Sequence, residues 1–64
     1  MFNRKYVSDK ALLINTDELR ELTGLGRDAA IKLGLQAGAR VVMGRLIFWH
    51  KKKILDEIER LAGN

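Results

Sequence analysis

The chain has 64 residues, a formal net charge of +4, and 47% apolar residues. This length allows one small domain. Because the sequence contains no cysteine, disulfide bonds are excluded, and a zinc site would have only His50 to build on. We therefore predict a domain that is stabilised by packing alone, with no metal ion and no cofactor.

Composition also restricts location and chemistry. Residues 2–10 are polar and basic, and the apolar run 11–14 is too short for a signal peptide or for the roughly 20 apolar residues of a membrane span. We expect a cytoplasmic protein with no membrane partner. A single histidine and no cysteine leave no nucleophile–base pair, so we do not expect an enzyme. Residues 1–9 are predicted to be a flexible tail, and residues 10–64 a domain.

The positive charge is concentrated in the middle of the sequence. Residues 1–24 have no net charge, and residues 54–64 have a net charge of −2. Residues 25–53 contain seven basic side chains and one acid, Asp28, which gives a net charge of +6. Such a region is typical of surfaces that bind phosphate, although a solvated basic face that only aids solubility has the same composition.

Residues 10–15 are predicted to form a short strand or an extended lead-in to a helix. The helix begins after Asn15 or Thr16 as its cap, because Glu18 stands three residues after Asn15 and acids favour the first turn. The inner face of this helix is predicted to carry two leucines one turn apart, Leu19 and Leu22.

A short turn separates this helix from a second one. Gly24 suits the left-handed residue that follows a helix, and Leu25–Gly26 forms the turn. The second helix is predicted over residues 27–36, with one side formed by Ala30, Leu33 and Gly34. The small residues of that side would let the two helices approach closely. The spacing is that of a helix-turn-helix, but helical hairpins that only pack have it too.

Residues 40–49 have the pattern of a β-hairpin. β-branched and aromatic residues flank the two-residue connection Gly44–Arg45, and glycine at its first position suits a type II′ turn. Arg45 then lies at or beside the tip and Arg40 at the base. This arrangement is typical of a DNA-binding wing, although a hairpin that only covers the core shares the pattern.

The last helix is predicted over residues 51–61, with Gly63 as its stop. Lys51, Lys52 and Lys53 occupy its first turn, where each exposed charge costs about 0.3–1 kcal/mol against the helix dipole. Helix N-termini bind anions, so we predict that these lysines contact phosphate; a solvated charge run is the alternative.

His50 is expected to be a cap, a core-edge residue or a phosphate contact rather than a catalyst. The core-directed face is formed by Ile54, Ile58 and Leu61, with Leu55 and Ala62 beside it.

The predicted order of strand, helix, turn, helix, hairpin and helix resembles small winged helix-turn-helix domains related to the MerR family. Within that group the chain resembles the excisionases (recombination directionality factors) of conjugative transposons and phages. The resemblance covers about residues 12–61 and is carried by four segments: 15–19, 25–30, 42–47 and 51–61. It implies an α+β fold, the small winged helix-turn-helix.

The resemblance also implies a function. The protein would bind and bend double-stranded DNA and direct a tyrosine recombinase (integrase) towards excision of a mobile element, with cooperative self-association on the DNA. The implied base-reading residues on the second helix are Arg27, Asp28, Ala29, Ile31 and Lys32. The implied wing residues are Arg40, Gly44 and Arg45, and the implied phosphate contacts are Lys51, Lys52 and Lys53. Ala29 and Ile31 depart from the polar or aromatic residues that are frequent in the family, so base readout would be partly apolar.

Two other functions fit the same residues. A small transcriptional regulator of a phage or plasmid would have the same fold and the same DNA contacts. A protein-interaction adaptor would use the basic face to bind an acidic partner. Salt-dependent DNA binding separates the adaptor from the first two.

Overall fold

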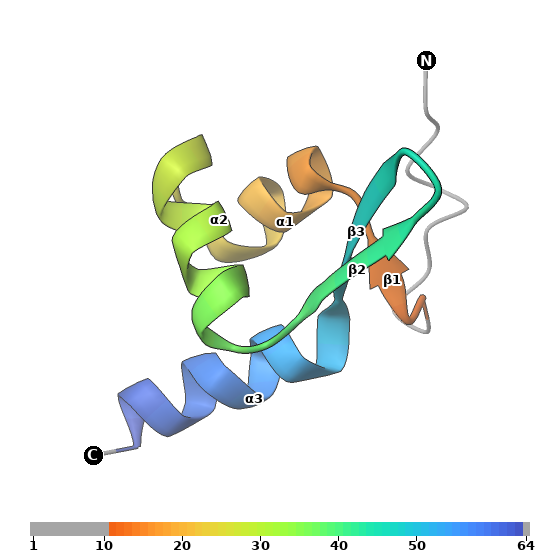
Figure 1. Ribbon diagram of the computed structural model, residues 1–64. Helices are drawn as coiled ribbons and strands as arrows, with labels where there is room; N and C mark the ends of the chain where they lie inside the picture. Colours follow the sequence, from red (N-terminus) through yellow and green to blue (C-terminus); the bar gives the residue numbers. More distant parts are fainter. Residues whose placement is uncertain (1–10, 64) are drawn as a thin grey trace.

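Three helices and a three-stranded antiparallel sheet form the α+β fold of residues 11–63, which are the residues that the computed structural model describes (Figure 1). The predicted tail, residues 1–9, lies outside the described residues. The element order agrees with the predicted one: β1 (Leu13–Ile14), α1 (Thr16–Thr23), α2 (Arg27–Gln36), β2 (Arg40–Met43), β3 (Leu46–His50) and α3 (Lys51–Ala62).

The sheet has the strand order β1-β3-β2, so β3 is its central strand. On one side Ile14 of β1 is opposite Trp49, and on the other side Arg40 of β2 is opposite the same residue. The β2–β3 hairpin continues from there to the pair Met43 and Leu46 beside the turn. Strand β1 has only two residues and is thus shorter than the predicted extended segment 10–15.

The start of α1 confirms the predicted capping box. Asn15 is the cap: its side-chain oxygen accepts a hydrogen bond from the backbone N–H of Glu18 at 2.7 Å, and the Glu18 carboxylate accepts one from the backbone N–H of Asn15 at 2.8 Å. Gly24 ends the helix with φ 74°, the left-handed conformation that the sequence predicts. The entry and exit of α1 are therefore fixed by local interactions.

The hairpin turn also has the predicted geometry. Gly44 has φ 62°, and no residue other than glycine has a positive φ within residues 11–63. A positive φ at the first central residue and a negative φ at the second are the values of a type II′ turn. This turn matches the twist of the two strands, so Arg45 lies at the end of a regular hairpin.

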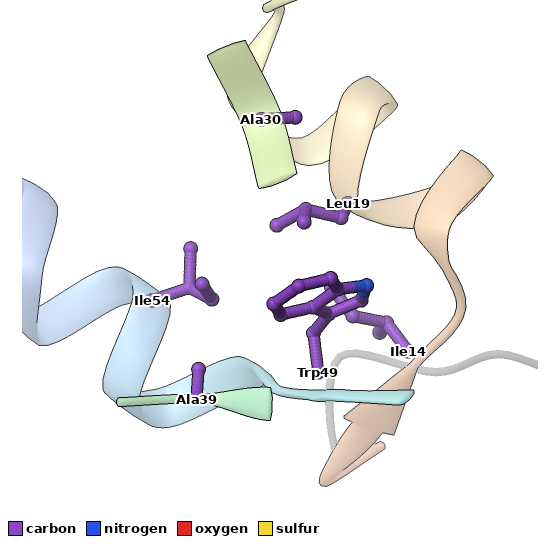
Figure 2. Packing of buried hydrophobic residues seen from close by; sticks show 6 residues of the cluster. All are labelled: Ile14, Leu19, Ala30, Ala39, Trp49 and Ile54. Carbon is purple, nitrogen blue, oxygen red and sulfur yellow. The ribbon is translucent and has the colours of Figure 1, made fainter. Parts of the chain in front are cut away.

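Side chains from β1, from each of the three helices and from Ala39, the residue before β2, meet around Trp49 of β3 (Figure 2). The indole is 2% exposed, and its Nε1–H donates to the Thr16 hydroxyl at 3.1 Å, which satisfies its only polar atom. A Cβ built on Gly34 would overlap the six-membered ring of Trp49, so glycine is needed at this contact. Gly34 thus admits the ring from β3, a role that the predicted close approach of α1 and α2 did not include. The buried cluster comprises Ile14, Leu19, Ala30, Ala39, Trp49 and Ile54.

Two predicted core positions lie at the margin of the core. Leu22 is 38% exposed and Leu61 is 48% exposed, while Ile58 is partly buried against the cluster. The core is centred on Trp49, and the last turns of α3 run away from the sheet (Figure 1). Helical periodicity identifies the inner face of a helix but does not show how far along the helix its partners continue.

Candidate nucleic-acid interface

Helix α2 presents a polar face to solvent. It begins directly after Gly26, which caps the helix without a side-chain hydrogen bond, so the first N–H groups of α2 have no side-chain acceptor from the cap. Ala30 and Gly34 are buried on the opposite side. Four of the five predicted base-reading residues are exposed: Arg27, Asp28, Ala29 and Lys32.

The fifth predicted residue, Ile31, does not belong to this face. Its side chain is partly buried and packs against the core cluster. In a helix, residue 31 is adjacent to Ala30 and three positions before Gly34, so it lies at the edge of the buried side. The expectation of an outward Ile31 is therefore corrected. The exposed positions that continue the face towards the helix end are Leu35 and Gln36.

The two arginines of the hairpin lie at its two ends. Arg45 is in the turn, whereas Arg40 pairs with Trp49 next to the start of α3. Arg45 and Lys51 are separated by the length of β3, roughly 20 Å for six extended residues. The structure therefore groups Arg40 with the first turn of α3 and leaves Arg45 alone at the far end of the hairpin.

The first turn of α3 is capped by His50, as one of its predicted roles required. The Nδ1 atom of His50 accepts a hydrogen bond from the backbone N–H of Lys53 at a long distance of 3.4 Å. Lys52 forms an ion pair of 3.3 Å with Asp56 one turn later, and both side chains are well exposed. The backbone N–H of Lys51 donates to the carbonyl of Leu12 at 2.9 Å, so the start of the helix is held by the segment before β1.

Most cations of the basic region are not neutralised by the fold. The ion pairs within residues 11–63 join Arg20 to Asp17, Lys52 to Asp56, and Arg60 to Glu57. None of them involves the exposed side chains Arg27, Lys32, Arg40 and Arg45. Between Asp28 and Asp56 the sequence contains no acidic residue. These cations are therefore open to an external anion.

The acidic side chain of Glu57 lies outside the basic region of the sequence and is hydrogen-bonded. Glu57 of α3 accepts hydrogen bonds from Arg60 at 2.6 and 3.1 Å and from Gln36 of α2 at 2.7 Å. These bonds, with that from Arg60 the larger cause, lower the pKa of Glu57 from 4.5 to about 2. The same pairing raises the pKa of Arg60. The contact joins the end of α2 to the middle of α3.

Sequence reasoning missed the exposed apolar residues of the hairpin. Val42, Met43, Leu46 and Ile47 are 42–60% exposed, and they belong to both faces of the two-stranded ribbon. A signal for this was present: residues 41–43 and 46–49 are uninterrupted apolar runs, whereas a strand with one solvated face alternates apolar and polar residues. We call residues 42–47 the distal hairpin.

Comparison of the chain with protein-family models, curated proteins and solved structures gave no match. Within residues 11–63, no group of three or more acidic, histidine or cysteine side chains is placed to hold a metal ion. No helix of that part of the chain is long and apolar enough to cross a membrane.

Proposed function

We propose that the protein is a small winged helix-turn-helix protein that binds double-stranded DNA. In this proposal α2 enters the major groove, the distal hairpin is the wing, and the first turn of α3 contacts the phosphate backbone. The observation that carries the proposal is the set of four exposed cations on α2 and the hairpin that no acidic side chain neutralises. Unpaired cations of this kind do not stabilise the fold, whereas they attract a polyanion such as DNA.

The three elements would have different tasks. Lys32 on the exposed face of α2 and Arg27 at the exposed first residue of the helix are suited to base edges and nearby phosphates, and Arg45 in the turn is suited to the minor groove. The lysines of α3 and Arg40 would hold the backbone without reading sequence. Asp28 and Ala29 complete the exposed face, whereas the half-buried Ile31 supports α2 from beneath.

Salt dependence tests this proposal directly. We expect the affinity for 30-base-pair duplexes, measured by fluorescence anisotropy, to fall steeply with salt, with a slope near −5 for about six phosphate contacts. Arg27→Gln should weaken binding and change sequence preference, whereas Arg20→Gln, an exposed arginine outside the proposed interface, should not. Absence of binding at low salt, or an equal effect of the two variants, would overturn the proposal in favour of the protein-interaction adaptor.

We further propose that the protein acts as an excisionase-like accessory factor, which bends DNA and directs a tyrosine recombinase towards excision of a mobile element. The element order supports this role through the resemblance described above. The test is a recombination assay with purified integrase and element-end DNA, with and without the protein. Excision that proceeds equally well without it would leave the transcriptional regulator as the remaining DNA-binding function.

A further inference from the structure

The distal hairpin exposes four large apolar side chains on either side of its turn. Val42 and Ile47 are opposite each other and are 52% and 42% exposed; Met43 and Leu46 are opposite each other and are 49% and 60% exposed. Because side chains alternate along a strand, Val42 and Ile47 share the sheet face of Trp49, and Met43 and Leu46 share the other face. The second pair directly flanks the turn.

The fold does not account for this exposure. The core lies at the opposite end of the hairpin, around Trp49, and the described helices do not cover the turn (Figure 1). A hairpin that only carried Arg45 to a phosphate would be served better by polar side chains, since an exposed apolar ribbon favours aggregation. The apolar pairs therefore indicate a partner.

The charges around the pairs define that partner's chemistry. Arg45 stands between Met43 and Leu46 and makes no ion pair, so the partner must accept a cation and apolar groups together. One candidate is the apolar groove of a second copy of this chain, but its lining contains no carboxylate to receive Arg45: Thr23, Leu25, Leu33, Ile58, Leu61 and Ala62. DNA meets both requirements, because anionic phosphates border a stack of apolar base faces.

We infer that Met43 and Leu46 form an apolar wedge that enters the minor groove and inserts at a base step, kinking the DNA. Arg45 holds the turn in the groove, and the flexible Met43 and the Leu46 side chain replace the lost base stacking. Wedges of this kind bend DNA by roughly 20–90° towards the major groove and favour the weakly stacked pyrimidine–purine steps. The inference rests on the proposed DNA binding and supplies the means by which the protein bends its site.

The experiment uses 30-base-pair duplexes that the wild-type protein selects from a random library. 2-Aminopurine replaces adenine at single pyrimidine–purine steps and becomes brighter when it unstacks, and energy transfer between dyes at the duplex ends reports the bend. The wedge variant is Met43→Thr/Leu46→Thr, because threonine keeps the strand propensity. The matched control is Leu22→Thr/Leu61→Thr, which makes the same kind of change at two exposed leucines outside the proposed interface and keeps Arg45.

We expect the wild-type protein and the control variant to brighten 2-aminopurine at one step and to bring the duplex ends closer. The wedge variant should lose both signals and keep its Kd within about threefold, because the phosphate contacts remain. Circular dichroism and Trp49 fluorescence show that each variant is folded.

Three results would overturn the wedge. The first is loss of both signals in the control but not in the wedge variant. The second is wild-type signals in both variants. The third is an unchanged bend in the wedge variant together with loss of self-association in sedimentation, which would assign the distal hairpin to a second copy. In all three the wild-type protein binds DNA, so the proposed function survives; failure to select any duplex would instead overturn the proposed function itself.

Discussion

The N-termini of α1 and α3 differ in how their free backbone N–H groups are capped and in the charges that surround the positive end of the helix dipole. At α1 the cap Asn15 and the acid Glu18 exchange two hydrogen bonds of 2.7 and 2.8 Å, and a second acid, Asp17, lies in the first turn. At α3 the cap is His50, its single hydrogen bond is 3.4 Å long, and the first turn contains lysines and no acid. The helix dipole stabilises the first arrangement and opposes the second.

The difference indicates that α1 is built for stability and that α3 gives up some stability for another purpose. Lys52 forms an ion pair with Asp56 of its own helix, and no acid lies in the first turn itself. A start of this kind becomes favourable when an anion neutralises it. The proposed phosphate contact therefore explains why the two helices differ, and each start can be altered separately.

The largest effect is expected when the lysines of α3 are reversed. Lys52→Glu/Lys53→Glu should lower DNA affinity about a hundredfold at 50 mM salt and reduce the salt slope by about two, equally for all duplex sequences. The same variant should change the free energy of unfolding by less than about 0.5 kcal/mol, because the gain from acids at a helix start is offset by loss of the Lys52–Asp56 ion pair. Anisotropy titrations and urea unfolding check the two statements, and a less stable protein with unchanged affinity would contradict the division of roles.

Loss of the α1 cap should have the next largest effect, and it should act on stability alone. Asn15→Ala removes the side-chain oxygen that accepts from the backbone N–H of Glu18, whereas the bond from the backbone N–H of residue 15 to the Glu18 carboxylate remains. The free energy of unfolding should fall by about 1–2 kcal/mol, which lowers the melting temperature by roughly 4–16 °C in a domain of this size. At temperatures where the variant is folded, its DNA affinity should equal that of the wild type.

The corresponding change at α3 should be milder. His50→Ala removes a single long hydrogen bond, so we expect a loss of about 0.5 kcal/mol, at the low end for capping residues. The same urea titration measures it beside Asn15→Ala. If the two alanine variants were equally destabilised, the contrast between the two helix starts would not hold.

The smallest effect concerns the acidic half of α3, where Glu57 joins Gln36 and Arg60. Because its pKa is about 2 in the folded protein against an ordinary 4.5, this carboxylate stabilises the fold above pH 4.5. Its contribution should diminish as the pH falls from 4.5 towards 2, because the unfolded state takes up the proton first, and it is lost once both states are protonated. Urea unfolding of wild type and Glu57→Gln at several pH values should show a stability difference that shrinks over this range. Glu59→Gln, on the same helix, controls for the change of carboxylate to amide.

Local signals allowed much of the fold to be predicted from the sequence. The capping box at Asn15, the left-handed Gly24 and the Gly44 turn each depend on neighbours within four residues, and all three are confirmed. The outward position of Ile31 was implied by the family resemblance and the inner position of Leu22 by helical spacing; Ile31 is partly buried and Leu22 is 38% exposed, because the packing of distant elements decides both. The assignments of Arg27, Lys32, Arg45 and the lysines of α3 to DNA stay predictions, although their exposure is now known.

The contact between Gly34 and Trp49 has an evolutionary consequence. The indole ring of β3 lies against bare backbone of α2, so the two elements proposed to contact DNA are held at a spacing that one ring determines. Enlarging residue 34 by a single methyl group would push the hairpin away from the helix. Among homologous chains, we expect residues 34 and 49 to covary: a larger residue at 34 should be found only with a smaller one at 49, so that the pair keeps a constant combined volume.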